Sequence, residues 1–234
     1  MYQQRSRWIL ILLPLIGLAV VGLAQDFSYA VGGGGPSLGA FMPNLTEIND
    51  FVEGNGFAPL TGSLFLVGGG GRGGLVPGLM LGGGGWGSWI TSSDGDLKAK
   101  YAVGVGGFDL GFAVGGTERS VLTIGALLGV GGARLTLTGI PNPVPLASVP
   151  RGIIPAPTRQ EYDSAFPIIV PYVEMQIGVL DWVGLSIRAG TVWTPFEFNG
   201  QDEGKLNPPR LSPGGWYVRI LIAFGAVIDL GDEH

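Results

Sequence analysis

The sequence contains no cysteine, and its one histidine, His234, is the last residue. A disulfide framework and a thiolate metal site are therefore impossible, and catalysis or metal binding through imidazole is not expected. Charge is also scarce: 13% of the residues are charged, and 18 acidic residues outnumber 13 basic ones. Nucleic-acid binding needs a basic patch or stripe that this balance does not supply. We expect no enzyme, no cofactor, no metal and no nucleic-acid partner.

Glycine and hydrophobic residues, in contrast, are abundant. The 44 glycines and 17 prolines make up about a quarter of the 234 residues, which is near the range of low-complexity chains. Yet 46% of the residues are hydrophobic and the mean hydropathy is +0.39, the opposite of a disordered composition. The chain must bury this apolar surface or immerse it in lipid. Its length allows one large all-β domain or two small ones.

The first 24 residues have the pattern of an export signal. Arg5 and Arg7 precede an apolar run over 8–21, and the small residues Gly22 and Ala24 follow it. The alternative is an uncleaved membrane anchor, but a run of about 14 residues is short for a spanning helix of about 20. We predict a signal peptide over 1–24 and a single β-barrel domain over 25–234. Removing the signal leaves 11 basic and 18 acidic residues, a formal charge of −7.

Beyond the signal, apolar residues alternate with small or polar ones, which is the period of a β-strand. No later segment offers 18 uninterrupted apolar residues, so a helical membrane protein is not expected. In the last segment one face is apolar at eight successive positions from Trp216 to Leu230. A strand of that length matches a tilted membrane strand better than a soluble one. The pattern predicts eight strands, over 27–34, 63–70, 75–91, 97–115, 121–138, 167–179, 183–193 and 215–230.

The 97–115 segment is ambiguous because its apolar face changes parity. Tyr101, Val103 and Val105 lie on one face, whereas Phe108 and Leu110 lie on the other. Gly106-Gly107 is therefore either a bulge in one strand or a two-residue hairpin turn. A single strand makes the connections alternate between short and mostly long, which is typical of outer-membrane barrels. The short connections are 71–74, 116–120 and 180–182, the moderate one is 92–96, and the long ones are 35–62, 139–166 and 194–214.

The hairpin around 180–182 predicts its own register. A three-residue loop pairs Val179 with Val183 and places Glu174 directly opposite Arg188, with apolar partners on one face and polar partners on the other. An inward-facing ion pair is expected in a polar lumen. The alternative is a solvated pair on the outside of a soluble sheet. We take Glu174, Arg188 and Arg219 as the candidate binding residues, forming an inward-facing ionic network.

With its signal, alternating strands and alternating loops, the chain resembles small bacterial outer-membrane β-barrel proteins. Gly225, Ile228 and Leu230 fall at the spacing of the C-terminal assembly signal of that class. Such signals normally end in Phe or Trp, whereas four residues follow Leu230 here. The resemblance implies an all-β, eight-stranded antiparallel up-and-down barrel in the outer membrane, with lipid and the barrel-assembly machinery as partners. Aromatics near strand ends would form interfacial girdles: Trp86, Trp89, Trp182, Trp193, Trp216 and Tyr217.

Four further segments carry recognisable patterns. Asn44 followed by Glu47 predicts the N-cap of a short helix over 45–54 that either lids or plugs the barrel or packs on an outer rim. The glycine-rich 69–74 segment satisfies G-x-G-x-x-G, but no helix-forming run follows, so nucleotide binding is not expected. Asp94-Gly95-Asp96 is interpreted as a hairpin turn rather than a calcium loop. The proline-rich 139–171 segment predicts an extended exposed loop.

Composition and pattern leave two classes of function. The first is an outer-membrane barrel with a structural, adhesive or small-solute passage role. The second is a secreted or cell-surface β-sandwich that self-assembles through edge strands. Acidic pairs such as Asp202-Glu203 lie in a polar loop and are not taken as catalytic. The sequence leaves open whether the lumen is open and which solute or ligand it would take.

Overall fold

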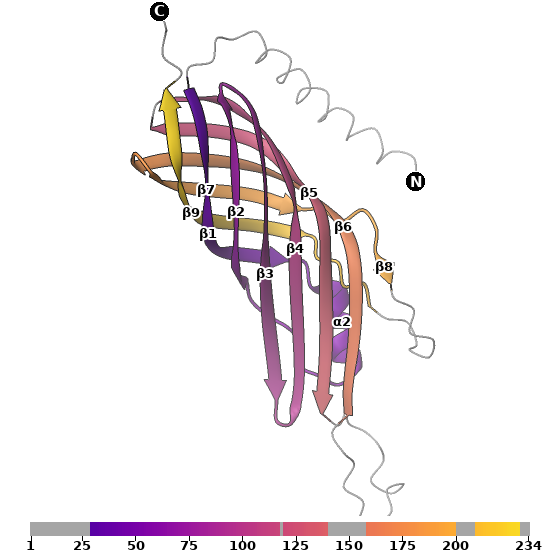
Figure 1. The fold of residues 1–234 in the computed structure, drawn as a ribbon. Coiled ribbons are helices and arrows are strands. Elements are labelled where there is room, and N and C mark those ends of the chain that lie inside the picture. The colour runs from indigo at the N-terminus through magenta and orange to yellow at the C-terminus, as the bar shows by residue number, and fades with distance from the viewer. Residues whose placement is uncertain (1–28, 118, 140–157, 200–208, 230–234) are drawn as a thin grey trace, which may run out of the picture.

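A computed structural model describes residues 29–117, 119–139, 158–199 and 209–229 of the chain. Over these residues the chain forms a closed antiparallel β-barrel (Figure 1). The barrel strands are β1 (Tyr29–Pro43), β2 (Leu64–Val76), β3 (Gly78–Asp94), β4 (Leu97–Thr117), β5 (Ser120–Gly139), β6 (Thr158–Leu180), β7 (Val183–Val192) and β9 (Gly215–Asp229). The two-residue β8 (Phe198–Asn199) pairs only with β6. The one helix described, α2 (Thr46–Gly54), lies between β1 and β2.

Each barrel strand pairs with its neighbours in the chain, β9 pairs with β1, and β5 pairs with β6. This confirms the predicted eight-stranded up-and-down barrel over the described residues. The alternative of a two-sheet sandwich is wrong, because pairing from β5 to β6 along 20 positions leaves no open edge there. None of the helices in the described ranges is long and apolar enough to span a membrane.

Three strands are longer than predicted by five residues or more, whereas β4 and β5 are longer by only two. β1 continues to Pro43, β2 continues to Val76, and β6 begins at Thr158. Their glycine- and proline-rich stretches were assigned to loops, but here they stay in the sheet. At Gly35 a Cβ atom would lie 2.1 Å from the backbone oxygen of Ile222, so the adjacent strand approaches more closely than any side chain allows. Glycine therefore marks close strand packing in this barrel as well as turns.

The two ends of the barrel differ in their connections. At one end, the short-turn end, adjacent strands are joined through Pro77, through 118–119 and through 181–182. At the other, the long-loop end, α2, 140–157 and 193–214 make the connections, and only the 95–96 turn is tight. Gly95 has φ +57°, so Asp94-Gly95-Asp96 forms the predicted hairpin turn. Figure 1 shows β1 beginning and β9 ending together at the short-turn end.

Strands β3 to β6 run past the other strands at the long-loop end (Figure 1). We call this part, residues 88–94, 97–103, 133–139 and 158–164, the extension. Within it β3 no longer pairs with β2, and β6 no longer pairs with β7. β4 alone has 21 residues, about twice the 9 to 11 that a tilted strand needs to cross a bilayer. The extension therefore continues beyond the length of a membrane-spanning strand.

β4 is one strand, and its pairing with β3 and β5 is continuous through Gly106-Gly107. The ambiguity over 97–115 is thus decided against a hairpin, and the register shift of β4 lies between Ala113 and Gly115 instead. Tyr101, Val103 and Val105 all point inward, and Phe108 and Leu110 point outward. The change in apolar parity is therefore a change in which side of the wall is apolar. It needs no bulge, because the strand alternation itself is unbroken.

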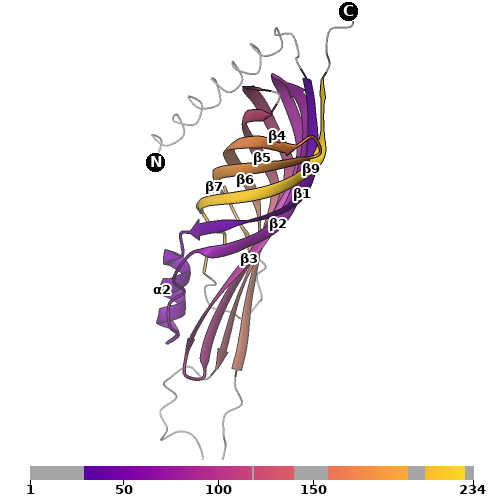
Figure 2. The ribbon, with the colours of Figure 1, turned by 90° about the vertical axis from the view of Figure 1, so that its left-hand side faces the viewer.

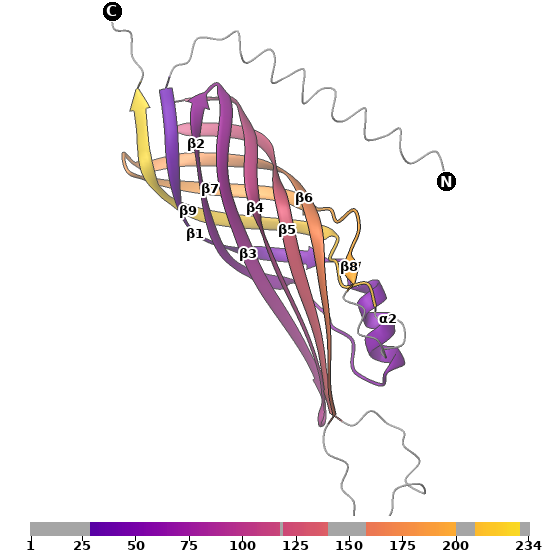
Figure 3. The same cartoon turned by 45° about the vertical axis from the view of Figure 1, so that its right-hand side comes forward.

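Helix α2 packs against the inward face of the extension (Figures 2 and 3). Ile48 and Val52 of the helix are buried in the same core as Tyr101, Leu135 and the other inward residues of the extension. The ring of Phe51 meets that of Tyr162 edge-on at 5.2 Å between centroids. The helix is neither a free lid nor an outer-rim element. It fills the mouth of the barrel on its inner side.

The predicted cap is displaced by one residue. The helix begins at Thr46 with Leu45 at the N-cap position, and the side chain of Asn44 accepts a hydrogen bond from the backbone N–H of Thr46 at 3.1 Å. The backbone N–H of Asn44 donates to the carbonyl of Gly214 at 2.7 Å. Asn44 is thus tied to the segment before β9, and the first helical turn starts after it.

The aromatic girdle is partly as predicted. Trp89, Trp182, Trp193 and Trp216 point outward and are 42–66% exposed. Trp86 and Tyr217 were assigned wrongly: both are buried inside the barrel, with ring centroids 6.3 Å apart. The reason is strand alternation, since Trp86 is three residues from Trp89 and Tyr217 is adjacent to Trp216.

The β6–β7 hairpin has the predicted register, with Glu174 opposite Arg188 and Ile177 opposite Leu185. Its turn differs, because Leu180 and not Val179 pairs with Val183, and an irregularity lies between Gly178 and Leu180. A shorter turn and one extra residue in β6 together give the same pairing as a three-residue loop.

Several predictions fall outside the described residues: the signal peptide over 1–24, the core of the proline-rich segment over 140–157, the acidic pair at 202–203, and the chain end from 230, with Leu230 and His234.

Candidate functional site

The candidate site is a cluster of charged side chains inside the barrel, which we call the ionic cluster. It consists of Arg72 from β2, Asp109 from β4, Glu174 from β6, Arg188 from β7 and Arg219 from β9. Each of these residues alternates with outward apolar or small neighbours, so the pleat turns it inward. All five side chains are buried, with 3–4% exposure for four residues and 6% for the side chain of Arg72.

The two carboxylates of the cluster are fully engaged. Glu174 accepts from Arg72 Nη2 at 2.6 Å through Oε1, and from the Nε–H of Arg188 through Oε2. Asp109 accepts from Arg188 Nη1 at 2.5 Å through Oδ2, and from the hydroxyl of Tyr172 through Oδ1. Arg188 thus bridges both acids. Charge-assisted hydrogen bonds of this kind are the strong ones, which matters because a buried charge is tolerated only when it is paired.

Tyr172 is an uncharged residue that contacts three charged side chains of the cluster. The centroid of its ring lies 3.6 Å from the guanidinium carbon of Arg188. Its hydroxyl accepts a hydrogen bond from Arg72 Nη1 at 3.3 Å and donates one to Asp109. Room for the ring comes from glycine on the two adjacent strands, β5 and β7. A Cβ at Gly125 would lie 2.5 Å from the Tyr172 hydroxyl, and one at Gly190 would lie 3.0 Å from its Cβ. Inward glycine in this region makes space for one large side chain.

The structure brings two of the three predicted residues into contact. Glu174 and Arg188 form an ion pair, and Arg219 lies directly opposite Arg188 on the adjacent strand without an ion pair to a described residue. Sequence reasoning missed Arg72, Asp109 and Tyr172. One signal was available: Asp109 stands between Phe108 and Leu110, and in a strand a residue between two outward-pointing neighbours must point inward. Arg72 sits in a glycine run that was read as a turn.

Between the cluster and the long-loop end, the interior is apolar. Phe41, Trp86, Tyr217 and Phe166 are 0–6% exposed and join the core that continues into the extension. Gly131 leaves room for the ring of Phe166, since a Cβ there would lie 2.4 Å from it. Tyr101 reaches across the core and donates to the carbonyl of Leu211 at 2.9 Å. This apolar half separates the ionic cluster from the long-loop end.

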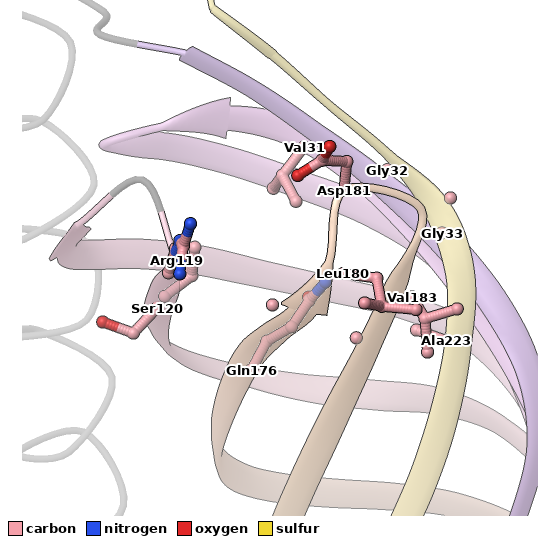
Figure 4. Close-up of a pocket in the computed structure, with 14 residues that line it drawn as sticks. Val31, Gly32, Gly33, Arg119, Ser120, Gln176, Leu180, Asp181, Val183 and Ala223 are labelled. Atoms are coloured by element: carbon pink, nitrogen blue, oxygen red, sulfur yellow. The ribbon is translucent and has the colours of Figure 1, made fainter.

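On the other side of the cluster, at the short-turn end, a small cavity of about 30 Å³ opens between two turns and adjacent strand ends. Figure 4 shows Arg119 from the β4–β5 turn, Asp181 from the β6–β7 turn, and Gln176 of β6 around it. The cavity beside the ionic cluster is smaller, about 20 Å³. Each of the two holds one or two waters at most. We find no group of three or more metal-ligating side chains among the described residues.

Apart from Trp89, the outward face of the extension is polar, unlike the outward face of the same strands toward the short-turn end. Lys98, Lys100, Arg134 and Arg159 share it with Glu161 and Asp163. Arg134 Nε lies 2.6 Å from Asp163 Oδ1, and both side chains are more than half exposed. A second surface feature lies beside α2, where a cleft of about 300 Å³ is lined by Glu47, Trp193 and Arg210, among others. Both features belong to the long-loop end.

Comparison with known proteins gives a limited result. No family model matches the chain, and no curated protein matches it. Among solved structures, it is similar to the attachment invasion locus protein Ail of Yersinia pestis. For Ail in complex with the heparin analogue sucrose octasulfate, the identity is 7% and the TM-score 0.44; for Ail alone they are 9% and 0.39. Both matches cover 87% of this chain and 100% of the other. At these values we infer neither family nor function from them.

Proposed function

We propose that this protein is an outer-membrane β-barrel that holds a rigid platform outside the membrane, with an adhesive or structural role. The observation that carries the proposal is the inversion of polarity along the outer wall. Outward residues of β4 are charged in the extension, at Lys98 and Lys100, and apolar toward the short-turn end, at Phe108 and Leu110. A wall that is apolar outside and ionic inside suits lipid, whereas a wall that is polar outside and apolar inside suits water.

The placement of the loops supports an outward-facing extension. Bacterial outer-membrane barrels have short periplasmic turns and long extracellular loops. Three of the four tight turns lie at the end where β1 begins and β9 ends, and the extension lies at the other end with α2, the 95–96 turn and the long connections. We therefore assign the short-turn end to the periplasm. Outward tryptophans occur toward both ends, with Trp182 in a tight turn and Trp216 at the start of β9, where interfacial girdles would stand.

The filled interior favours a platform over solute passage. The apolar half is closed by Phe41, Trp86 and Phe166, and the cavity at the ionic cluster measures only about 20 Å³. Eight-stranded barrels are narrow enough for side chains to fill. Lipid is the partner of the outer apolar band under this proposal, and the barrel-assembly machinery is the partner in insertion. A planar-bilayer recording of the purified barrel should show no single-channel steps.

The absence of cysteine makes the topology directly testable. Ser93→Cys in the extension and Asp181→Cys in a tight turn each introduce one exposed thiol into the full chain. On whole cells, a membrane-impermeant maleimide should label Ser93→Cys and leave Asp181→Cys unlabelled until the outer membrane is permeabilised. Phe108→Cys is the matched control in the apolar band and should stay unlabelled in folded protein in both conditions. Release of the protein into the medium, or labelling in the reverse order, would overturn the proposal.

A further inference from the structure

The ionic cluster contains more positive than negative charge. Three guanidinium groups, on Arg72, Arg188 and Arg219, face two carboxylates, on Asp109 and Glu174. If both acids are ionised, the buried side chains carry a formal charge of +1. Arginine cannot relieve this by losing its proton, because its pKa is too high for that in proteins. The excess charge must therefore be balanced by something other than deprotonation.

The excess positive charge of the cluster is located on Arg219. All four carboxylate oxygens of the cluster already accept from Arg72, Arg188 or Tyr172. Arg219 forms no ion pair within the described part of the chain, and its Nε is buried without a hydrogen-bond partner. The residue is 4% exposed and lies directly opposite Arg188 across the β7–β9 ladder. Like charges in directly opposed positions are destabilising, and a buried unpaired charge is costly.

The cavity beside the cluster is lined by Arg219 together with Arg72, Arg188 and Ser186. Asp109 and Glu174 also line it, but their oxygens are held by the donors already described. Its volume of about 20 Å³ is enough for one water-sized particle and too small for a phosphate or sulfate group. The lining therefore combines a net positive charge, unused donors and room for one small occupant.

We propose that this cavity binds a single monovalent anion of the halide class, chloride under physiological conditions, held by the guanidinium of Arg219. Such an ion would neutralise the cluster and accept hydrogen bonds from groups that have no protein partner. It would also separate the charges of Arg188 and Arg219. The barrel would then be most stable with the anion bound, because a ligand that binds only the folded state stabilises it by mass action.

The test uses the full-length barrel refolded in detergent. Sodium chloride is compared with sodium gluconate at equal ionic strength, since gluconate is too large for the cavity. Unfolding in urea is followed by the gel shift, the difference in gel mobility between the folded, unheated barrel and the unfolded, boiled chain. We expect the unfolding equilibrium constant to fall about tenfold for each tenfold rise in chloride concentration above the dissociation constant for chloride. The ³⁵Cl NMR line should be broadened by the folded protein, and bromide should reverse the broadening. Equal stability in the two salts together with no reversible broadening would overturn the proposal.

Two variants locate the site. Arg219→Met removes the buried charge at similar volume and should abolish both the chloride dependence of stability and the ³⁵Cl broadening. Arg134→Met removes an exposed guanidinium on the extension and should leave both unchanged. Persistence of the full chloride dependence in Arg219→Met would show that the anion binds elsewhere, and so would its loss in Arg134→Met. If Arg219→Met does not refold, reversible broadening in the wild-type protein still supports a small-anion site.

Discussion

The inside of this barrel is built in two different ways. Toward the short-turn end, charged side chains from β2, β4, β6, β7 and β9 form the ionic cluster, while the outer surface is apolar. Toward the long-loop end, aromatic and aliphatic side chains fill the interior under α2, and the outer surface is charged. The same four strands, β3 to β6, run through both regions. The same strand therefore carries its apolar row on the outer side in one region and on the inner side in the other, which under the proposed function matches lipid in the first and water in the second.

The half of the barrel that contains the ionic cluster should lose more stability on substitution of a single residue than the apolar half. Glu174→Gln keeps the shape but leaves Arg72 and Arg188 without a charged partner, and we expect the free energy of unfolding to fall by about 4 kcal/mol, as for a broken buried pair. Urea titration of the refolded protein, followed by the gel shift, measures this. A loss below about 1 kcal/mol would mean that the cluster is hydrated and behaves like a surface pair.

A charge introduced on the outer wall around the ionic cluster should lower the stability of the barrel. Phe108→Arg places a cation on the face that we assign to lipid, and we expect a loss of about 3 kcal/mol in lipid bilayers. Lys100→Arg, eight residues away on the same face of β4 but in the extension, is the matched control and should have little effect. Unfolding in urea from vesicles compares the two. Equal tolerance at both positions would break the distinction between the halves.

The apolar half should depend on α2. Ile48→Ala removes a side chain that is 2% exposed and packs in the core of the extension, so we expect a loss of about 2 kcal/mol. Asp50→Ala on the exposed side of the same helix should change stability by less than about 0.5 kcal/mol. Limited proteolysis should cut the segment between β1 and β2 faster in Ile48→Ala only. An unchanged rate would mean that α2 does not anchor the extension.

The smallest effect should come from the surface of the extension. Asp163→Asn removes the partner of Arg134, but both side chains are more than half exposed, so the loss should be about 0.5 kcal/mol and should vanish at high salt. Thermal unfolding at low and high ionic strength measures it. A large, salt-independent loss would indicate that this pair is part of a buried network.

Much of the architecture could be predicted from residue patterns. The alternation from Trp216 onward predicts the last strand, and matching of polar with polar residues predicts the pairing of Glu174 with Arg188. The ends of β1, β2 and β6 could not be predicted, because glycine and proline favour turns locally and remain in the sheet here only through pairing on both sides. The parity change in β4 looked like a bulge because period-two reasoning assumes one apolar face per strand.

The ionic cluster shows the same limit. Glu174 and Arg188 could be paired because they lie in one hairpin, where sequence distance fixes geometry. Asp109 on β4 and Arg72 on β2 come from strands that do not pair with β6 or β7, so no local pattern relates them to Glu174 and Arg188. Arg219 was predicted to point inward, but its position directly opposite Arg188 follows from the register of β7 with β9, which was not predicted. Trp86 and Tyr217 were assigned to the girdle because they lie near strand ends, without asking whether their side chains point inward or outward.

By itself, the sequence determined what each strand could be: the period of two, the turn residues, and the surplus of apolar over charged side chains that demands lipid or a core. It also excluded chemistry based on cysteine. Closure of the barrel decided which side chains from different strands meet. Only when β5 pairs with β6 and β9 with β1 do inward rows from distant strands face each other, and only then do glycines become room for Tyr172 and Phe166. Proximity across a closed barrel depends on register around the whole ring, which no single segment of sequence contains.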